Sequence, residues 1–350
     1  MIREIPIPSH FDPAHAASWS YRPNEMDLFA KAPEWAKAHG VRPSGSDKKK
    51  VRLLLIDVQK DFCFPEGTLY VGGRSGRGAI EDSEKIASFI YRNLGVVTDI
   101  MTTMDTHFAF QIFFPSFWVD QAGSPLGAHR VVTVDEIRKG LAVPNPAVVK
   151  LIPKRDYTWL KRQVEFYCRE LERAGKYQLY LWPFHCLLGG DGHALAGVIQ
   201  EARLFHAFAR GSQSWAEVKG GNVLTENYSV LKPEVLVTWD GEALAQKNAR
   251  FVKTLLESDV VIIAGQAASH CVKSSIDDLL TEIVAVDEKL ASKVYIMSDC
   301  MSAVAVPDGK GGFIADFTPQ AEDAYKRFAA AGMRIVSSKD PIDSWPGVAL

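Results

Sequence analysis

Continuously apolar runs recur along the chain and alternate with amphipathic stretches of helical period. The pattern predicts strands at 51–57, 96–103, 177–181, 214–219, 259–264, 293–298 and 333–337. It predicts helices at 79–93, 157–174, 193–209, 243–257, 271–282 and 318–331. Runs such as VRLLLID and VVIIAG are typical of parallel strands covered on both faces. The alternation therefore predicts an α/β fold, a doubly wound, mostly parallel sheet flanked by helices.

The first 49 residues differ in character from the rest of the chain. Prolines at positions 6, 8, 13 and 23 interrupt regular structure, and residues 25–39 predict one short helix. A linker is expected at 43–46, before the first strand. The prediction is an N-terminal extension over residues 1–49 and a single domain over residues 50–350.

Composition narrows the class of partner. The 350 residues are 47% hydrophobic and 23% charged, with a net charge of −2 and no long basic block, so nucleic acid is not expected as a partner. No apolar stretch approaches the roughly 20 residues that span a bilayer. The five cysteines contain no CxxC pair, and the N-terminus lacks an apolar signal core, which together favour a reducing compartment and the cytoplasm. The sequence is compatible with both a monomer and a homo-oligomer.

Three chemically active side chains fall at or just after predicted strand ends. Asp57 ends the first strand, Lys219 ends the strand at 214–219, and Cys271 follows the strand at 259–264 and a small-residue turn. Each alone has an ordinary explanation, as a turn cap, a surface lysine or a buried cysteine. Ligands of such sheets bind at the carboxyl ends of the strands, so the three are predicted to form one site. Asp61 is expected to be more exposed than Asp57.

Cys271 is the predicted nucleophile of this site. It opens the helix predicted at 271–282, and a helix N-terminus is expected to lower the pKa of a thiol. Its backbone N–H and that of Ala267 can form an oxyanion hole.

A second group of residues has the composition of a metal site. Asp105 and His107 are separated by one residue at a strand end, so both side chains face the same side, and His185 comes from another loop. Two imidazoles and a carboxylate suit Zn²⁺ first, with Fe²⁺ or Mn²⁺ as alternatives. The aromatic residues Phe62, Trp182 and Tyr228 lie close in sequence to the predicted site residues, and can wall a flat ligand by stacking.

Five motifs, in order, are LLIDVQKDF, DTH, WPFHCLLGGDG, KGGNVLTENYS and AGQAASHCV. Through them the chain resembles the nicotinamidase branch of the isochorismatase-like cysteine hydrolases over roughly residues 51–340. The resemblance implies Cys271 as nucleophile, Asp57 as general acid and base, and Lys219 as third member of a triad. It also implies a cis peptide before Ala267, a substrate ring held between Phe62 and Trp182 with Tyr228 nearby, and metal ligation by Asp105, His107 and His185.

Two departures from the family pattern affect the prediction. Many members carry a further histidine after the DxH motif, whereas this chain has Gln111 near that place. The chain is also long for the family, with an enlarged region at 120–180.

The resemblance implies hydrolysis of nicotinamide to nicotinate and ammonia through a cysteine thioester. The alternatives are a related amidase acting on another small carboxamide or carbamoyl compound, and a metal- or small-molecule-binding protein without turnover. Isochorismatase activity is disfavoured, because that vinyl-ether hydrolysis does not use a cysteine nucleophile. A purely structural scaffold is a further alternative.

Overall fold

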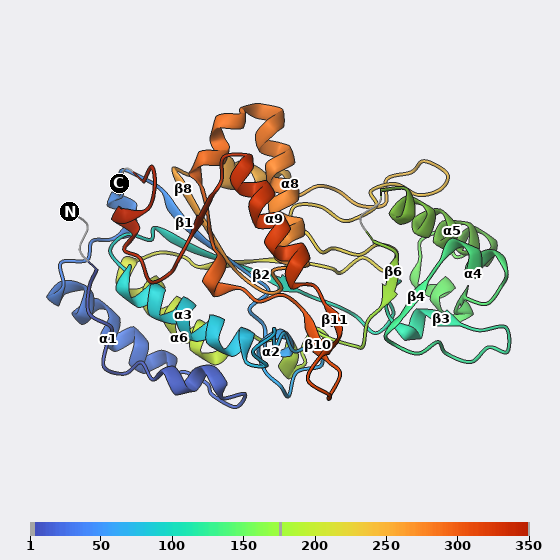
Figure 1. Cartoon of the computed structure of the whole chain (residues 1–350), viewed down its shortest axis with the longest axis horizontal. Helices are drawn as coiled ribbons and strands as arrows, with labels where there is room; N and C mark the ends of the chain where they lie inside the picture. Colours follow the sequence, from blue (N-terminus) through green and yellow to red (C-terminus); the bar gives the residue numbers. More distant parts are fainter. Residues whose placement is uncertain (1–3, 175–176, 349–350) are drawn as a thin grey trace.

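A six-stranded parallel sheet forms the centre of the molecule in the computed structural model, which describes residues 4–174 and 177–348 (Figure 1). The strand order is β12-β9-β8-β1-β2-β7. The strands are β1 (Val51–Ile56), β2 (Asp99–Asp105), β7 (Trp215–Lys219), β8 (Val260–Gly265), β9 (Val294–Met297) and β12 (Arg334–Val336). Every neighbouring pair is parallel, which confirms the predicted α/β fold class.

Helices cover both faces of this sheet, so the apolar strands are buried on two sides. One face carries α1 (Glu25–Ala38), α3 (Gly78–Arg92) and α6 (Gly197–Arg210); the other carries α7 (Ala249–Leu256), α8 (Cys271–Val286) and α9 (Thr318–Ala330). The helix predicted at 243–257 begins later than expected. Asn248 caps it, because its side chain accepts a hydrogen bond of 3.2 Å from the N–H of Phe251.

The N-terminal segment packs on the outer face of the helical layer. Leu28, Ala32 and Ala36 lie four residues apart on α1 and are buried against α6. The division of the chain into an extension and one domain remains a prediction.

A separate lobe stands beside the sheet and has its own hydrophobic core (Figure 1). It contains β3 (Trp118–Val119), β4 (Arg130–Val132), α4 (Val134–Arg138), β5 (Val143–Pro144), α5 (Tyr157–Ala174) and β6 (Leu179–Leu181). The strand predicted at 177–181 is therefore real, but it is not part of the main sheet. It pairs antiparallel with β4, because its apolar alternation fits the lobe core equally well.

Two smaller elements complete the fold. Helix α2 (Lys60–Cys63) follows β1, and the hairpin of β10 (Ala305–Pro307) and β11 (Phe313–Asp316) precedes α9. Among the helices of the described residues, none combines the length and apolar character needed to cross a bilayer.

Candidate active site

Asp57, Lys219 and Cys271 come together at the carboxyl edge of the sheet. The ammonium nitrogen Nζ of Lys219 lies 2.9 Å from Asp57 Oδ2 and 3.7 Å from Cys271 Sγ. The three residues are 0%, 5% and 8% exposed, respectively. Strands β1 and β7 both flank β2, and α8 begins at Cys271, so three segments distant in sequence supply one cluster.

The position of Asp57 depends on a residue that the sequence reasoning missed. Asp57 has a left-handed backbone, with φ of 47°, at the point where the chain leaves β1. The Thr103 hydroxyl donates a 2.5 Å hydrogen bond to Asp57 Oδ1 and accepts one of 3.0 Å from the Asp57 N–H. One carboxylate oxygen is thereby fixed to β2, and the other faces Lys219.

Burial dominates the protonation of this cluster. It raises the pKa of the Cys271 thiol well above its usual value, and the nearby charges of Asp57 and Asp105 add to the effect while Lys219 opposes it. The expected lowering of this pKa is therefore wrong, because desolvation of the buried thiol is the largest cause of its shift. Burial also raises the pKa of Asp57, against the opposing charge of Lys219.

Lys219 stays charged within this buried cluster. Burial works against its ammonium group, but Asp105 and Asp57 outweigh it and raise the pKa of Lys219 well above its usual value. At rest the cluster therefore holds a protonated thiol beside a lysine ammonium, and the thiol needs a base before it can act as a nucleophile.

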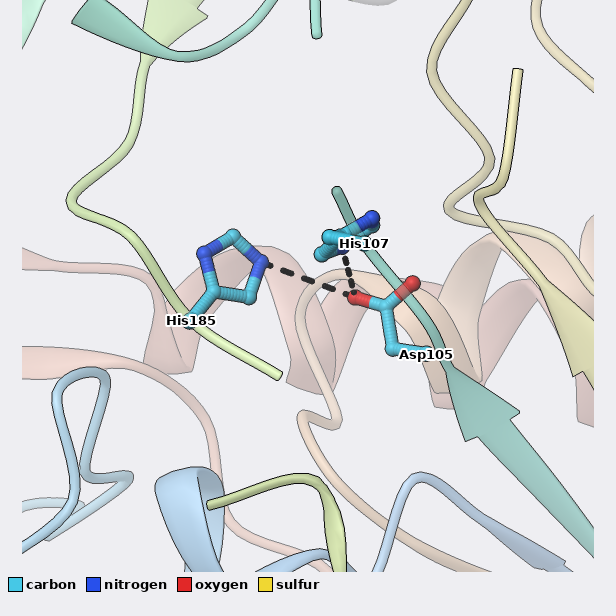
Figure 2. Close-up of side chains that lie close together, drawn as sticks. All are labelled: Asp105, His107 and His185. Atoms are coloured by element: carbon cyan, nitrogen blue, oxygen red, sulfur yellow. Dashed lines mark ion pairs between the residues drawn. The ribbon is translucent and has the colours of Figure 1, made fainter. Parts of the chain in front are cut away.

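Asp105 connects the triad to two histidines. Its Oδ1 lies 3.0 Å from Lys219 Nζ, and its Oδ2 lies 2.9 Å from His107 Nε2 and 3.6 Å from His185 Nε2. Figure 2 shows both imidazoles directed at this carboxylate. One ligand atom from each of the three buried residues falls within 4.8 Å of the others, which is close enough to surround one ion.

The hydrogen bonds of the histidines fit a cation between these side chains. His107 Nδ1 lies 3.2 Å from the carbonyl oxygen of Gly220, and His185 Nδ1 lies 2.8 Å from that of Pro183. A carbonyl oxygen only accepts, so each Nδ1 carries a hydrogen, and each Nε2 is the ring nitrogen that lies toward Asp105. A histidine whose Nδ1 is held by a backbone carbonyl, with Nε2 directed at the site, is the second-shell pattern typical of metal-binding histidines.

Gln111, which occupies the place where the resemblance suggested a further histidine, uses its amide in other contacts. Its Nε2 donates to the carbonyl oxygens of Gly220 and Asn222, and its Oε1 accepts from the N–H of Phe108. Gln111 therefore stabilises the loop after β7 through hydrogen bonds to its backbone. In the described part of the chain, the group of side chains that could hold a metal ion, here termed the metal cluster, consists of Asp105, His107 and His185.

A pocket of about 540 Å³, counting its opening to solvent, lies above the triad. The predicted aromatic residues Phe62, Trp182 and Tyr228 line it, together with Cys271 and the metal cluster. Asp57 and Lys219 are not among the lining residues and lie beneath its floor. A ligand in this pocket thus meets the thiol, the imidazoles and the aromatic walls at once.

The turn before Cys271 contains the cis peptide that the resemblance implied, between Gln266 and Ala267. The backbone N–H groups of Ala267 and Cys271 make no hydrogen bond to the neighbouring backbone within the described residues. Both residues line the pocket. The two amides are therefore available to an oxygen atom of a ligand.

Three further residues had no role in the sequence reasoning. Asp61 is more exposed than Asp57, as expected, at 7% against 0%, and it accepts a hydrogen bond of 2.7 Å from the N–H of Cys186, next to His185. Gln59 donates to the carbonyl oxygen of Asp105 and accepts from its N–H. Glu226 lines the pocket. All three lie inside the quoted motifs, which was the available signal.

Several solved structures are similar to this chain in fold. A nicotinamidase/pyrazinamidase of Acinetobacter baumanii is 16% identical over 84% of this chain and 99% of its own, with a TM-score of 0.48. The yeast nicotinamidase bound to nicotinaldehyde is 17% identical over 82% of this chain and 99% of its own, with a TM-score of 0.49. A zinc-bound pyrazinamidase of Pyrococcus horikoshii is 16% identical over 82% of this chain and 99% of its own, with a TM-score of 0.44. No protein-family model and no curated protein matches the sequence.

Proposed function

We propose that the protein is a cysteine amidohydrolase that cleaves nicotinamide to nicotinate and ammonia. The carrying observation is Lys219, whose Nζ lies 2.9 Å from Asp57 Oδ2 and 3.7 Å from Cys271 Sγ beneath the pocket. A buried acid, cation and thiol in contact are costly to maintain for stability alone. Their position below a pocket with aromatic walls supports nucleophilic catalysis on a flat amide.

Each proton in the reaction has a residue to carry it. Asp57 accepts the thiol proton, and the Cys271 thiolate attacks the amide carbonyl carbon, while the charge of Lys219 stabilises the anions formed. The oxyanion rests on the N–H groups of Ala267 and Cys271. Asp57 then protonates the departing nitrogen, which leaves as ammonia, and a thioester remains on Sγ. Asp57 finally deprotonates a water molecule, whose attack on the thioester releases the carboxylic acid and the thiol.

Asp105, His107 and His185 are the residues that would hold a divalent ion, with Zn²⁺ first and Fe²⁺ or Mn²⁺ as alternatives. An ion bound there would supply a Lewis acid for a ring nitrogen of the substrate. The chain's own part is to orient the ring between Phe62 and Trp182, beside Tyr228, so that the carboxamide faces Cys271.

A second small carboxamide or carbamoyl compound is the alternative substrate, since the same triad would cleave it. A protein that only binds such a ligand would not need the triad. We place the enzyme in the cytoplasm, because five cysteines are free thiols.

The test is ammonia release from nicotinamide by the purified protein, with the metal content measured on the same sample. The matched variant is Cys271→Ala, and Cys168→Ala, a buried cysteine of the lobe, serves as control. Release that is lost only in Cys271→Ala supports the proposal. Release that persists in Cys271→Ala contradicts the thioester mechanism, and absence of release from the wild type contradicts nicotinamide as the substrate.

A further inference from the structure

One buried lysine joins the N-terminal segment to the short helix behind the pocket wall. Lys60 opens α2, three residues after Asp57, and is 6% exposed. Its ammonium group donates a hydrogen bond of 2.6 Å to the carbonyl oxygen of Trp19 and lies 5.1 Å from the centre of the Trp19 ring. Two segments that are 41 residues apart in the chain are therefore joined at α2.

The partners of this ammonium group are not those usual for a buried lysine. Lysine side chains are rarely buried unless they pair with a carboxylate, whereas Lys60 is held by a backbone carbonyl and an indole ring. Burial accordingly lowers the pKa of Lys60, against the more favourable charge of Asp191. A hydrogen bond to a carbonyl fixes direction as well as distance, which an apolar side chain in the same space would not do.

Trp19 is itself held in place by contacts other than Lys60. Its ring packs edge-on against the buried Phe64, with the ring centres 5.8 Å apart and the planes at 84°. Two residues later, the Tyr21 hydroxyl donates a hydrogen bond to Glu201 of α6, whose carboxylate is buried. The Trp19 carbonyl is therefore a fixed point against which Lys60 can hold α2.

Helix α2 carries part of the pocket wall. Phe62 lines the pocket, and its ring centre lies 5.7 Å from that of His185. The carbonyl oxygen of Phe62 accepts a hydrogen bond of 2.9 Å from the N–H of Val71, which also lines the pocket. Asp61 holds the N–H of Cys186, next to His185. A displacement of this single turn would therefore move the Phe62 ring and its neighbours in the wall.

We propose that Lys60 is a positioning residue, which fixes α2 against Trp19 and thereby holds the Phe62 ring in place for the substrate. Within the described part of the chain, Lys60 is not one of the residues that line the pocket, so it acts through Phe62. The N-terminal segment then belongs to the framework of the active site. The effect on kinetics rests on the amide hydrolysis proposed above, whereas the effect on α2 does not.

The experiment compares Lys60→Met, which removes the ammonium group, with Lys60→Arg, which keeps a cation that can donate to a carbonyl and stack on an indole. Tyr21→Phe is the matched control, because it removes a different hydrogen bond of the same segment, to α6. The measurements are kcat and KM for nicotinamide, and the alkylation rate of Cys63 in the native protein. Cys63 belongs to α2 and is 0% exposed, so it reacts only when α2 opens. Cys168 of the lobe is the internal reference.

Lys60→Met should raise KM and the alkylation rate of Cys63 each by about tenfold, as for the loss of one hydrogen bond from a charged group. The value of kcat should change less than KM, because the triad is untouched. Lys60→Arg should lie closer to wild type in both measurements, and Tyr21→Phe should leave both unchanged. Unaltered alkylation of Cys63, equal acceleration of Cys63 and Cys168, or a fall in kcat at constant KM would overturn the inference.

A double-mutant cycle tests the route through Phe62. If Lys60 acts through this ring, Lys60→Met should raise KM less in a Phe62→Leu background than in the wild-type background. Equal increases in the two backgrounds would show that Lys60 affects the pocket by another path, and would overturn its role as a positioning residue for Phe62.

Failure of the proposed function gives a different result, namely wild-type protein that releases no ammonia from nicotinamide. The alkylation of Cys63 needs no substrate and then decides the role of Lys60. Acceleration in Lys60→Met that is confined to Cys63 supports the positioning of α2 by Lys60, and an unchanged rate overturns it.

Discussion

The carboxylate of Asp105 lies between two sites, with Oδ1 at 3.0 Å from Lys219 Nζ and Oδ2 facing His107 and His185. The pairing of β2 with β7 creates this arrangement, because Asp105 and Lys219 are register partners at the ends of their strands. Burial alone would raise the pKa of Asp105, but His107 and Lys219 outweigh it and hold the pKa well below its usual value. One ionised carboxylate therefore joins the triad to the metal cluster.

Removal of the Lys219 charge should damage both sites. Lys219→Met leaves Asp57 and Asp105 buried without their shared cation, which should cost about 3–5 kcal/mol of stability and lower kcat by about 10²–10⁴-fold. Chemical denaturation and amide hydrolysis measure the two effects. Lys273→Met, which removes an ion pair with Asp277 on the surface of α8, is the matched control and should change neither appreciably. Full activity in Lys219→Met would exclude the lysine from the triad.

His185→Ala should reduce the metal content and raise KM more than it lowers kcat. The reason is that His185 is one of the three side chains that could hold an ion, and it lines the pocket. Elemental analysis and steady-state kinetics check the two effects, and a chelator should produce the same change in wild type. His193→Ala is the control, since His193 hydrogen-bonds Thr106 and lies outside the cluster. Full metal occupancy in His185→Ala would remove it from the ligand set.

Asp57→Asn should separate thiol reactivity from turnover. The charge of Asp57 helps to raise the pKa of Cys271, so its removal should lower that pKa and speed alkylation at neutral pH. Turnover should nevertheless fall by about 10²–10⁴-fold, because the general base is lost. In the wild type, alkylation should rise about tenfold per pH unit above pH 7, as expected for a thiol whose pKa is high.

Iodoacetamide labelling followed by peptide mass spectrometry measures these rates at Cys271. The other four cysteines are buried and do not line the pocket, so they provide an internal reference. Slower labelling of Cys271 in Asp57→Asn would mean that Asp57 promotes the thiolate at rest, in contradiction to the pKa direction given above.

The sequence could predict the sheet because its strands are continuous apolar runs, and the placement of Asp57 and Lys219 followed from the rule that sites lie at strand ends. It could not predict protonation, because the pKa of Cys271 depends on total burial and on charges contributed by other strands. It could not place Glu226 either, because the contact with Trp182 joins positions 44 residues apart. The pairing of β6 with β4 could not be predicted either, because it joins strands that are distant in sequence.

Asp82 on α3 predicts how the stability of the fold changes with pH. It is 3% exposed, and its Oδ2 accepts a hydrogen bond of 2.8 Å from Gln266 Nε2, in the turn before Cys271. Burial raises the pKa of Asp82 to about 6. The native state therefore binds more protons than the unfolded state between about pH 4 and pH 6, so the free energy of unfolding should fall as pH rises through this range.

Asp82→Asn should remove this dependence, because asparagine keeps an acceptor for Gln266 without ionising. The variant should be more stable than wild type at pH 7 by up to about 3 kcal/mol, and the difference should vanish near pH 4. Urea unfolding at several pH values from 4 to 7.5 measures it. Asp323→Asn, whose side chain is 75% exposed, is the control and should follow wild type. Parallel curves for Asp82→Asn and wild type would show that Asp82 stays ionised throughout, and that its hydrogen bond to Gln266 compensates fully for its burial.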